Sequence, residues 1–169
     1  MTQARDAKPD DAASPLPPLK LSRVLHARRE TVFKAWSEAE HIKRWFAPET
    51  YIVPQAHVEM RVGGPFELTM RSPAGEEHRL CGTFVEIVPN TRLVIDMRVD
   101  DSAGAPLFRA YTEVDFVDAP GGTRLDVVQT YTLIDLSKAW MVAGAPQGWN
   151  STLDKLEREA TRLEDGGNP

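Results

Sequence analysis

Alternating apolar and polar residues fill most of the stretch 51–132, and turn residues interrupt the pattern at short intervals. Phe66, Leu68 and Met70, for example, alternate with polar neighbours, which is the period of two of a strand with one buried face. We expect six strands here, and their short connections favour antiparallel neighbours. The predicted turns are 63–64, 72–76, 89–90, 104–106 and 121–122.

The segment before this series predicts one more strand and two short helices. Residues 19–25 have the apolar spacing of a strand. In residues 29–46 the apolar side chains fall at helical intervals, and Ser37 followed by Glu40 has the spacing of a capping box. We therefore expect the two helices to be separated at Ser37.

The C-terminal segment 135–163 predicts a long helix. One apolar stripe runs along it, which needs a partner surface, and the sheet is the only surface large enough. Asp135 and Ser137 are competing N-caps, and Pro146 should kink or break the helix. The fold class is α+β. The stripe consists of Trp149, Leu153, Leu156, Ala160 and Leu163.

Composition and charge indicate which partners and which cellular compartment to expect, and where the folded domain begins and ends. The net charge of −5 argues against a nucleic-acid partner, and the interspersed charges leave no patch for an anionic membrane. A single cysteine, Cys81, suits a reducing compartment, so we expect a cytoplasmic protein. Residues 1–18 are rich in Pro, Ala and Asp, which predicts a disordered tail, as does the polar stretch 164–169. The folded domain should span residues 19–163.

A set of residues and segments follows the chain in a distinctive order: Arg23, the segments 32–36, 59–66, 82–89 and 122–125, and Trp45, Gly148, Trp149, Leu153 and Leu156. This ordered set resembles a known family. The chain is similar to the START-like superfamily, also called SRPBCC or helix-grip after the fold of the birch-pollen allergen. Within it, the chain resembles homologues of the activator of heat-shock protein 90 ATPase. It differs from the family pattern at Pro146, where the helix normally continues, and at Gln129, where histidine is common.

The resemblance implies a helix-grip fold, in which a curved antiparallel sheet wraps around the long C-terminal helix and two short helices follow the first strand. It also implies a START-like domain over residues 19–163 and a possible chaperone partner in the stress response. The same superfold hosts lipid carriers, hormone receptors, cyclases and chaperone partners, so function has to be argued from the site.

The candidate site is an apolar cavity between the sheet and the final helix. The tryptophans can pack in the core or form an aromatic wall, and in a hollow domain both roles can overlap. The predicted cavity residues are Trp36, Trp45, Met60, Phe66, Met70, Phe84, Glu86, Met97, Gln129, Tyr131, Trp149 and Leu153.

Two of these residues are polar on otherwise apolar faces. Glu86 shares a predicted strand face with Leu80 and Phe84, so it either orients a ligand, pairs with Arg61 or is hydrated. Gln129 lies between Val127 and Tyr131 on another face. The alternation alone leaves a functional and a structural role open for both.

No motif predicts a metal site, a cofactor or a catalytic residue. The histidines lack the spacing of a helical metal site, and no serine or cysteine motif marks a nucleophile. Our leading hypothesis is therefore a monomeric or homodimeric protein that binds a small apolar ligand without catalysis. A co-chaperone that stimulates a chaperone ATPase is the second hypothesis. A cyclase or hydrolase acting on a polyketide-like substrate, with Glu86 as base, is the third.

Overall fold

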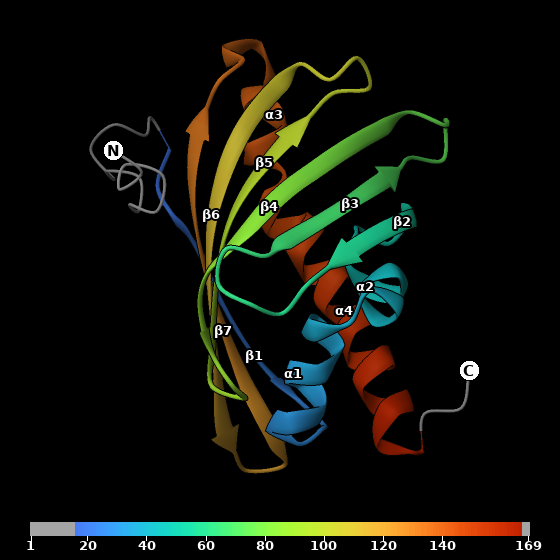
Figure 1. Cartoon of the computed structure of the whole chain (residues 1–169), viewed down its shortest axis with the longest axis vertical. Coiled ribbons are helices and arrows are strands. Elements are labelled where there is room, and N and C mark those ends of the chain that lie inside the picture. Colours follow the sequence, from blue (N-terminus) through green and yellow to red (C-terminus); the bar gives the residue numbers. More distant parts are fainter. Residues whose placement is uncertain (1–15, 167–169) are drawn as a thin grey trace.

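The computed structural model describes residues 16–166, and within them the chain forms seven strands, four α-helices and one 3₁₀ helix (Figure 1). The α+β class and the expected element order are confirmed. The elements are β1 (Leu19–Leu25), α1 (Arg29–Ser37), α2 (Ala39–Trp45), β2 (Ile52–Val58), β3 (Pro65–Arg71), β4 (Glu77–Val88), β5 (Arg92–Asp100), β6 (Pro106–Ala119), β7 (Gly122–Leu133), η3 (Leu136–Lys138), α3 (Ala139–Ala143) and α4 (Ala145–Glu164).

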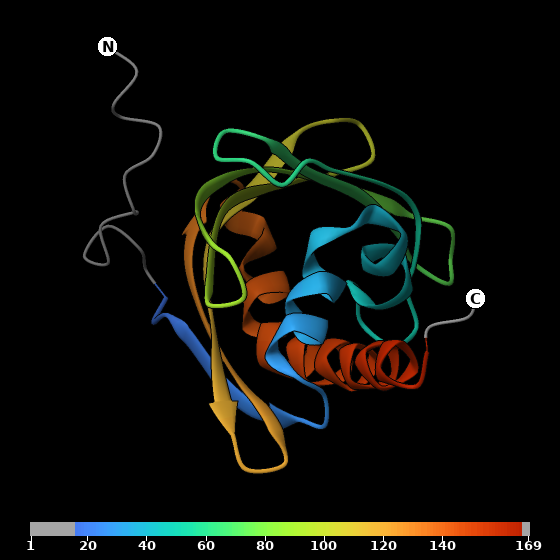
Figure 2. The same ribbon diagram turned by 60° about the horizontal axis from the view of Figure 1, so that its bottom comes forward.

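All seven strands form one antiparallel sheet in the order β1-β7-β6-β5-β4-β3-β2. The sheet is curved, and α4 lies across its concave side together with α1 and α2 (Figures 1 and 2). This is the helix-grip arrangement that the resemblance implied. Pro54 lies within β2, where the missing N–H is tolerated because β2 is an edge strand.

The boundary between the first two helices differs from the expectation. The helices are separated at Glu38, not at Ser37, and no side chain caps the start of α2. The Ser37 hydroxyl instead donates to the carbonyl oxygen of Phe33 at 2.6 Å, one turn back on α1. A serine hydroxyl in the last turn of a helix can bond backward in this way, so the capping-box spacing was misleading.

The C-terminal helical segment is interrupted before Pro146, as expected. Asp135 caps η3 by accepting a hydrogen bond from the backbone N–H of Ser137. The short α3 ends at Ala143, Gly144 is its C-cap, and Pro146 occupies the first turn of α4. Proline is tolerated there because the first N–H groups of a helix have no partner within it.

The chain ends fall partly outside the described residues. Of the predicted tail 1–18, only residues 16–18 are described, and Leu16 packs against the core. Of the predicted tail 164–169, Glu164 belongs to α4 and its carboxylate lies 3.3 Å from Nε of Arg28. Residues 1–15 and 167–169 lie outside the residues that the structure describes.

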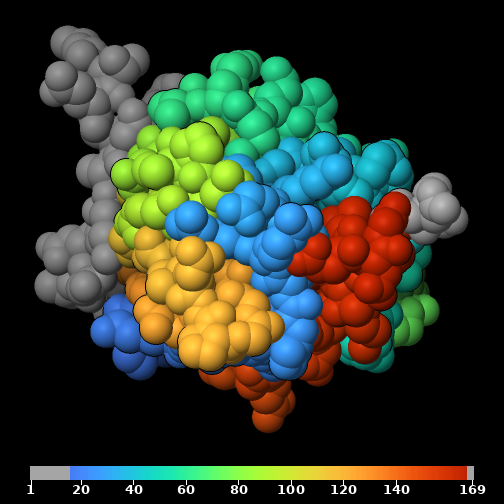
Figure 3. All heavy atoms as spheres, turned by 90° about the horizontal axis from the view of Figure 1, so that it is seen from below, coloured from blue at the N-terminus to red at the C-terminus, as the bar shows by residue number. Residues whose placement is uncertain are grey.

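One end of the domain is filled with side chains. Seen from below, α1, the β6–β7 hairpin and the C-terminal end of α4 lie against one another (Figure 3). Under α1 and α2, aromatic rings pack mostly edge to face, as in the pair Trp36 and Trp45, whose centroids are 4.7 Å apart. The aromatic cluster comprises Phe33, Trp36, Trp45, Phe46, Phe66, Phe84, Phe116 and Trp149.

Candidate ligand-binding cavity

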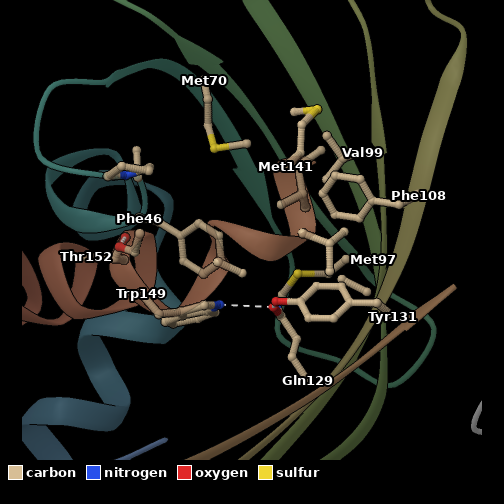
Figure 4. Close-up of a pocket in the computed structure, with 17 residues that line it drawn as sticks. Phe46, Met70, Met97, Val99, Phe108, Gln129, Tyr131, Met141, Trp149 and Thr152 are labelled. Carbon is tan, nitrogen blue, oxygen red and sulfur yellow. Dashed lines mark hydrogen bonds between the residues drawn. The ribbon is translucent and has the colours of Figure 1, made fainter. Parts of the chain in front are cut away.

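A cavity of about 170 Å³ lies between the concave face of the sheet, α3 and the first turns of α4 (Figure 4). It occupies the end of the domain at which α3 lies, away from the filled end. Its walls are almost entirely apolar, and none of the described residues on them carries a charge. They are Phe46, Ala47, Pro48, Met70, Leu80, Met97, Val99, Phe108, Ala110, Gln129, Tyr131, Met141, Val142, Ala145, Gly148, Trp149 and Thr152.

Strand alternation places the sheet side of the wall. Met97 and Val99 of β5 are two residues apart, as are Gln129 and Tyr131 of β7, so each pair shares the concave face. The β5–β6 register pairs Met97 with Ala110, and the β6–β7 register pairs Ala110 with Tyr131. Three neighbouring strands therefore present one continuous surface to the cavity.

Hydrogen bonds to α4 hold the loop that follows α2 against the cavity. Nζ of Lys155 donates to the backbone oxygens of Pro48 at 3.0 Å and Tyr51 at 3.2 Å. Arg158 binds the carboxylate of Glu49 at 2.9 Å. Because of its burial, the pKa of Lys155 lies below its ordinary value. These bonds fix Pro48 on the wall.

Helix α3 closes the cavity on a further side. Met141 and Val142 line it, whereas Trp140 of the same helix is 67% exposed. Consecutive positions on a helix point about 100° apart, so a helix of this length can turn one face inward and leave its neighbours in solvent. The interruption at Gly144 allows α3 to approach the sheet separately from α4.

A buried polar cluster stands at one side of the cavity. The side-chain oxygen of Gln129 accepts hydrogen bonds from the Tyr131 hydroxyl and from Nε1 of Trp149, the latter at 2.9 Å (Figure 4). Nε2 of Gln129 donates to Oγ1 of Thr112 at 2.9 Å. The amide of Gln129 is thereby held in one orientation between α4 and the sheet.

Tyr131 stays neutral in this setting. Burial raises the pKa of its hydroxyl well above the ordinary value, and the neighbouring Trp149 N–H offsets only part of that rise. A phenolate would lack a compensating cation among the described residues of the wall. The cavity therefore offers hydrogen-bonding groups and no charge.

The structure brings together some of the predicted site residues. Met70, Met97, Gln129, Tyr131 and Trp149 line the cavity. Six of the others do not line it, because they pack in the core or against it. These are the buried residues Trp36, Trp45, Phe66, Phe84 and Leu153, and the partly buried Met60.

Glu86 does not face the cavity, contrary to its predicted strand face. A bulge leaves Val85 without a partner on β5 and shifts the register between Phe84 and Glu86. Phe84 is consequently buried, whereas the Glu86 side chain is 48% exposed. Its partner is Nε of Arg92 at 2.8 Å, not Arg61.

Several wall residues were not predicted from the sequence. Phe108 lies in the part of β6 that precedes the clear alternation, and Phe46 lies just past α2. Met141 and Val142 belong to the segment that the sequence assigned to one long helix. The glycine before Pro146 is the signal that could have separated α3 from α4 and directed attention to its apolar face.

The described residues form neither a metal centre nor a membrane-spanning helix. Within 16–166, no group of three or more His, Cys, Asp or Glu side chains could hold a metal ion. No helix in that part of the chain has the length and apolarity to cross a membrane. The cavity is the candidate site.

Solved structures of bacterial proteins share this fold. One protein, from Rhizobium leguminosarum, is 27% identical with a TM-score of 0.75, over 86% of this chain and 94% of that one. A protein of Silicibacter pomeroyi described as AHSA1 is 23% identical with a TM-score of 0.72, over 86% and 99%. One from Arthrobacter aurescens is 20% identical with a TM-score of 0.77, over 92% and 90%. No curated protein matches the sequence.

A family model also matches the chain over residues 26–161, and its description is "Activator of Hsp90 ATPase homolog 1-like protein". The match begins just after β1 and runs through most of α4, so it includes the strands β2 to β7, the helices and every wall of the cavity. The chain therefore belongs to the family of activator of Hsp90 ATPase homologue 1-like proteins, within the START-like helix-grip superfamily.

Proposed function

We propose that this protein binds a small apolar molecule in the cavity between the sheet and α4. The observation that carries the proposal is the volume of about 170 Å³ behind uncharged, largely apolar walls. An engineered apolar cavity of roughly 150 Å³ in another protein stays dry and takes up benzene, so this volume suits a ligand with about one ring. Three methionines on the wall, Met70, Met97 and Met141, can adapt their shape to such a ligand.

Catalysis is not part of the proposal. A cyclase or hydrolase reaction would need an acid or base beside the ligand. Glu86, the expected base, pairs with Arg92 away from the cavity, and burial keeps Tyr131 neutral. We place the binding function in the cytoplasm because a lone cysteine, Cys81, suits a reducing compartment.

A matched pair of variants tests ligand binding. Ala145 lines the cavity and Ala143, two residues earlier, is exposed. A phenylalanine at position 145 should fill the cavity and abolish binding of toluene, measured by isothermal titration calorimetry. The Ala143→Phe variant should bind as the wild type does. Equal toluene binding by all three proteins, or none by the wild type, would exclude this cavity as the binding site.

Binding to a chaperone is the second candidate function, and one surface feature favours it. A groove of about 480 Å³ between α2, the start of β2 and α4 carries more cations than carboxylates, which suits an acidic segment of a partner. Stimulation of purified Hsp90 ATPase by the wild type, and its loss in Lys43→Glu, would support this role. The absence of any stimulation would reject it. The charged residues of the groove are Lys43, Arg44, Glu49, Lys155, Arg158, Glu159 and Arg162.

A further inference from the structure

The hydrogen bonds around Gln129 have a fixed direction. Nε1 of Trp149 can only donate, so its contact at 2.9 Å identifies Oε1 of Gln129 as the carbonyl oxygen. The Tyr131 hydroxyl contacts the same oxygen. Since a carbonyl oxygen cannot donate, the hydroxyl proton of Tyr131 must point toward Gln129.

The other end of Gln129 agrees with this direction. Its amide nitrogen donates to Oγ1 of Thr112 at 2.9 Å. That hydroxyl in turn lies 3.4 Å from the backbone oxygen of Ala110, which can only accept. The carbonyl oxygen of Gln129 therefore accepts two hydrogen bonds. Its amide nitrogen donates to the hydroxyl of Thr112, whose own proton is directed to the backbone oxygen of Ala110.

The Tyr131 oxygen consequently remains an acceptor at the cavity wall. Its proton is used, and the nearby N–H of Trp149 occupies at most one of its two lone pairs. The hydroxyl of Thr152 likewise donates its proton to a protein atom, the backbone oxygen of Gly148 at 2.8 Å. The hydroxyls on this wall thus offer oxygen lone pairs, and a ligand that donates a proton would satisfy them.

We propose that the ligand is a neutral molecule with an apolar body and a hydroxyl group that donates its proton to the oxygen of Tyr131. This inference rests on the proposed ligand-binding function of the cavity. A carboxylate or an amine would leave its charge unpaired, because no described residue of the wall is charged. An ether or a ketone without a hydrogen-bond donor would bring its oxygen close to the acceptor oxygens of Tyr131 and Thr152, and these oxygens would repel one another.

Phenol and toluene provide the test because a hydroxyl replaces a methyl group on the same ring. Isothermal titration calorimetry would give the ratio of their affinities in the wild type, in Tyr131→Phe and in Met70→Leu. Loss of one neutral hydrogen bond should lower the phenol-to-toluene ratio about fivefold in Tyr131→Phe. The Met70→Leu change on the apolar part of the wall should alter both affinities equally and leave the ratio unchanged.

Each outcome decides a different claim. An unchanged ratio in Tyr131→Phe, with both probes still binding, overturns the hydroxyl proposal and leaves the cavity function standing. If neither probe binds the wild type, the proposed function itself fails.

Gln129→Leu is the second variant, for use if Tyr131→Phe does not fold. Without the Gln129 carbonyl, the Tyr131 hydroxyl can rotate its proton toward the ligand, so anisole should gain about fivefold over toluene. No gain for anisole overturns the proposal.

Discussion

The indole Nε1 of Trp149, on α4, donates a 2.9 Å hydrogen bond to the side-chain oxygen of Gln129, on β7. On one side the indole of Trp149 stacks on Trp36, with ring centroids 6.4 Å apart and an interplanar angle of 19°. On the other side it forms part of the cavity wall. Trp149 is therefore both a core residue and a wall residue, and it separates the filled half of the domain from the hollow half.

Removing the Trp149 ring should destabilise the fold strongly. Trp149→Ala should lower the free energy of unfolding by roughly 3–5 kcal/mol, because the residue is 9% exposed and the loss of its ring leaves space beside Trp36. Urea denaturation measures this change. Trp140→Ala is the matched control, since a residue that is 67% exposed should change stability by less than about 0.5 kcal/mol. Equal effects of the two substitutions would contradict the packing described for Trp149.

A buried carboxylate joins α2 to α4 and makes stability depend on pH. The Glu159 side chain is 4% exposed, and it accepts hydrogen bonds from Nδ1 of His41 and Nε of Arg162, both at 2.8 Å. Arg44 lies 3.9 Å from the carboxylate, and Glu38 faces the other ring nitrogen of His41. Burial would raise the pKa of Glu159, but Arg162 and His41 outweigh it and hold the pKa below its ordinary value.

The sign of the pH dependence follows from that lowered pKa. The stabilisation by Glu159 is complete above the unfolded pKa of about 4.5 and is lost as pH falls through the lower folded pKa. At pH 7 the Glu159→Gln variant should be less stable than the wild type by about 1.5–3 kcal/mol. Urea denaturation at several pH values should show the gap narrowing below about pH 4. A gap that stays constant down to pH 3 would show that the carboxylate charge contributes nothing.

Two glycines should respond to alanine in opposite ways. Gly148 lies inside α4, and an added Cβ would meet its nearest neighbour, Cγ of Pro48, at an ordinary 3.7 Å. Gly148→Ala should therefore stabilise the fold by about 0.5–1 kcal/mol through helix propensity. At Gly122 the same Cβ would lie 1.9 Å from the backbone oxygen of Leu25, so Gly122→Ala should destabilise by more than about 1 kcal/mol. Thermal denaturation of both variants is the measurement, and a stabilised Gly122→Ala would contradict the close approach of the β6–β7 hairpin to β1.

Neutralising Glu86 should have little effect. Its ion pair with Arg92 is half-exposed, and Arg92 keeps Glu113 and Asp115 as partners. Glu86→Gln should change the free energy of unfolding by less than about 0.5 kcal/mol and leave toluene affinity unaltered. Chemical denaturation and calorimetry on the same sample measure both. A large loss of ligand affinity would mean that Glu86 reaches the cavity after all.

The fold could be predicted largely from local patterns. Phe66 and Leu68 of β3 alternate with polar residues because only one face of the sheet is buried, and that pattern is visible without a structure. The apolar stripe of α4 is equally plain, since Trp149, Leu153 and Leu156 are all buried on one side of the helix. Burial of one face imposes both periods directly on the sequence.

The cavity was harder to predict because it depends on a β-bulge and a helix break, which the periodic patterns do not reveal. The bulge at Val85 turns the Glu86 side chain to the opposite face of the sheet, and the residue type at position 85 does not indicate a bulge. The wall residues Met141 and Val142 depend on a helix break whose geometry follows from tertiary packing. Alternation could assign Phe66 and Met97 to one side of the sheet, but it could not show which of them lines the cavity.

The indole N–H signals of the tryptophans in a ¹⁵N–¹H spectrum give the most direct test of ligand binding in the cavity. Addition of toluene to the wild-type protein should shift the signal of Trp149, which lines the cavity. The signal of exposed Trp140 should not move, nor should that of Trp45, whose Nε1 is bound to the backbone oxygen of Ala35 at 2.9 Å. A saturable shift confined to Trp149 is the result we predict. An unmoved Trp149 signal at saturating toluene, or a shift of Trp140 alone, would contradict ligand binding in this cavity.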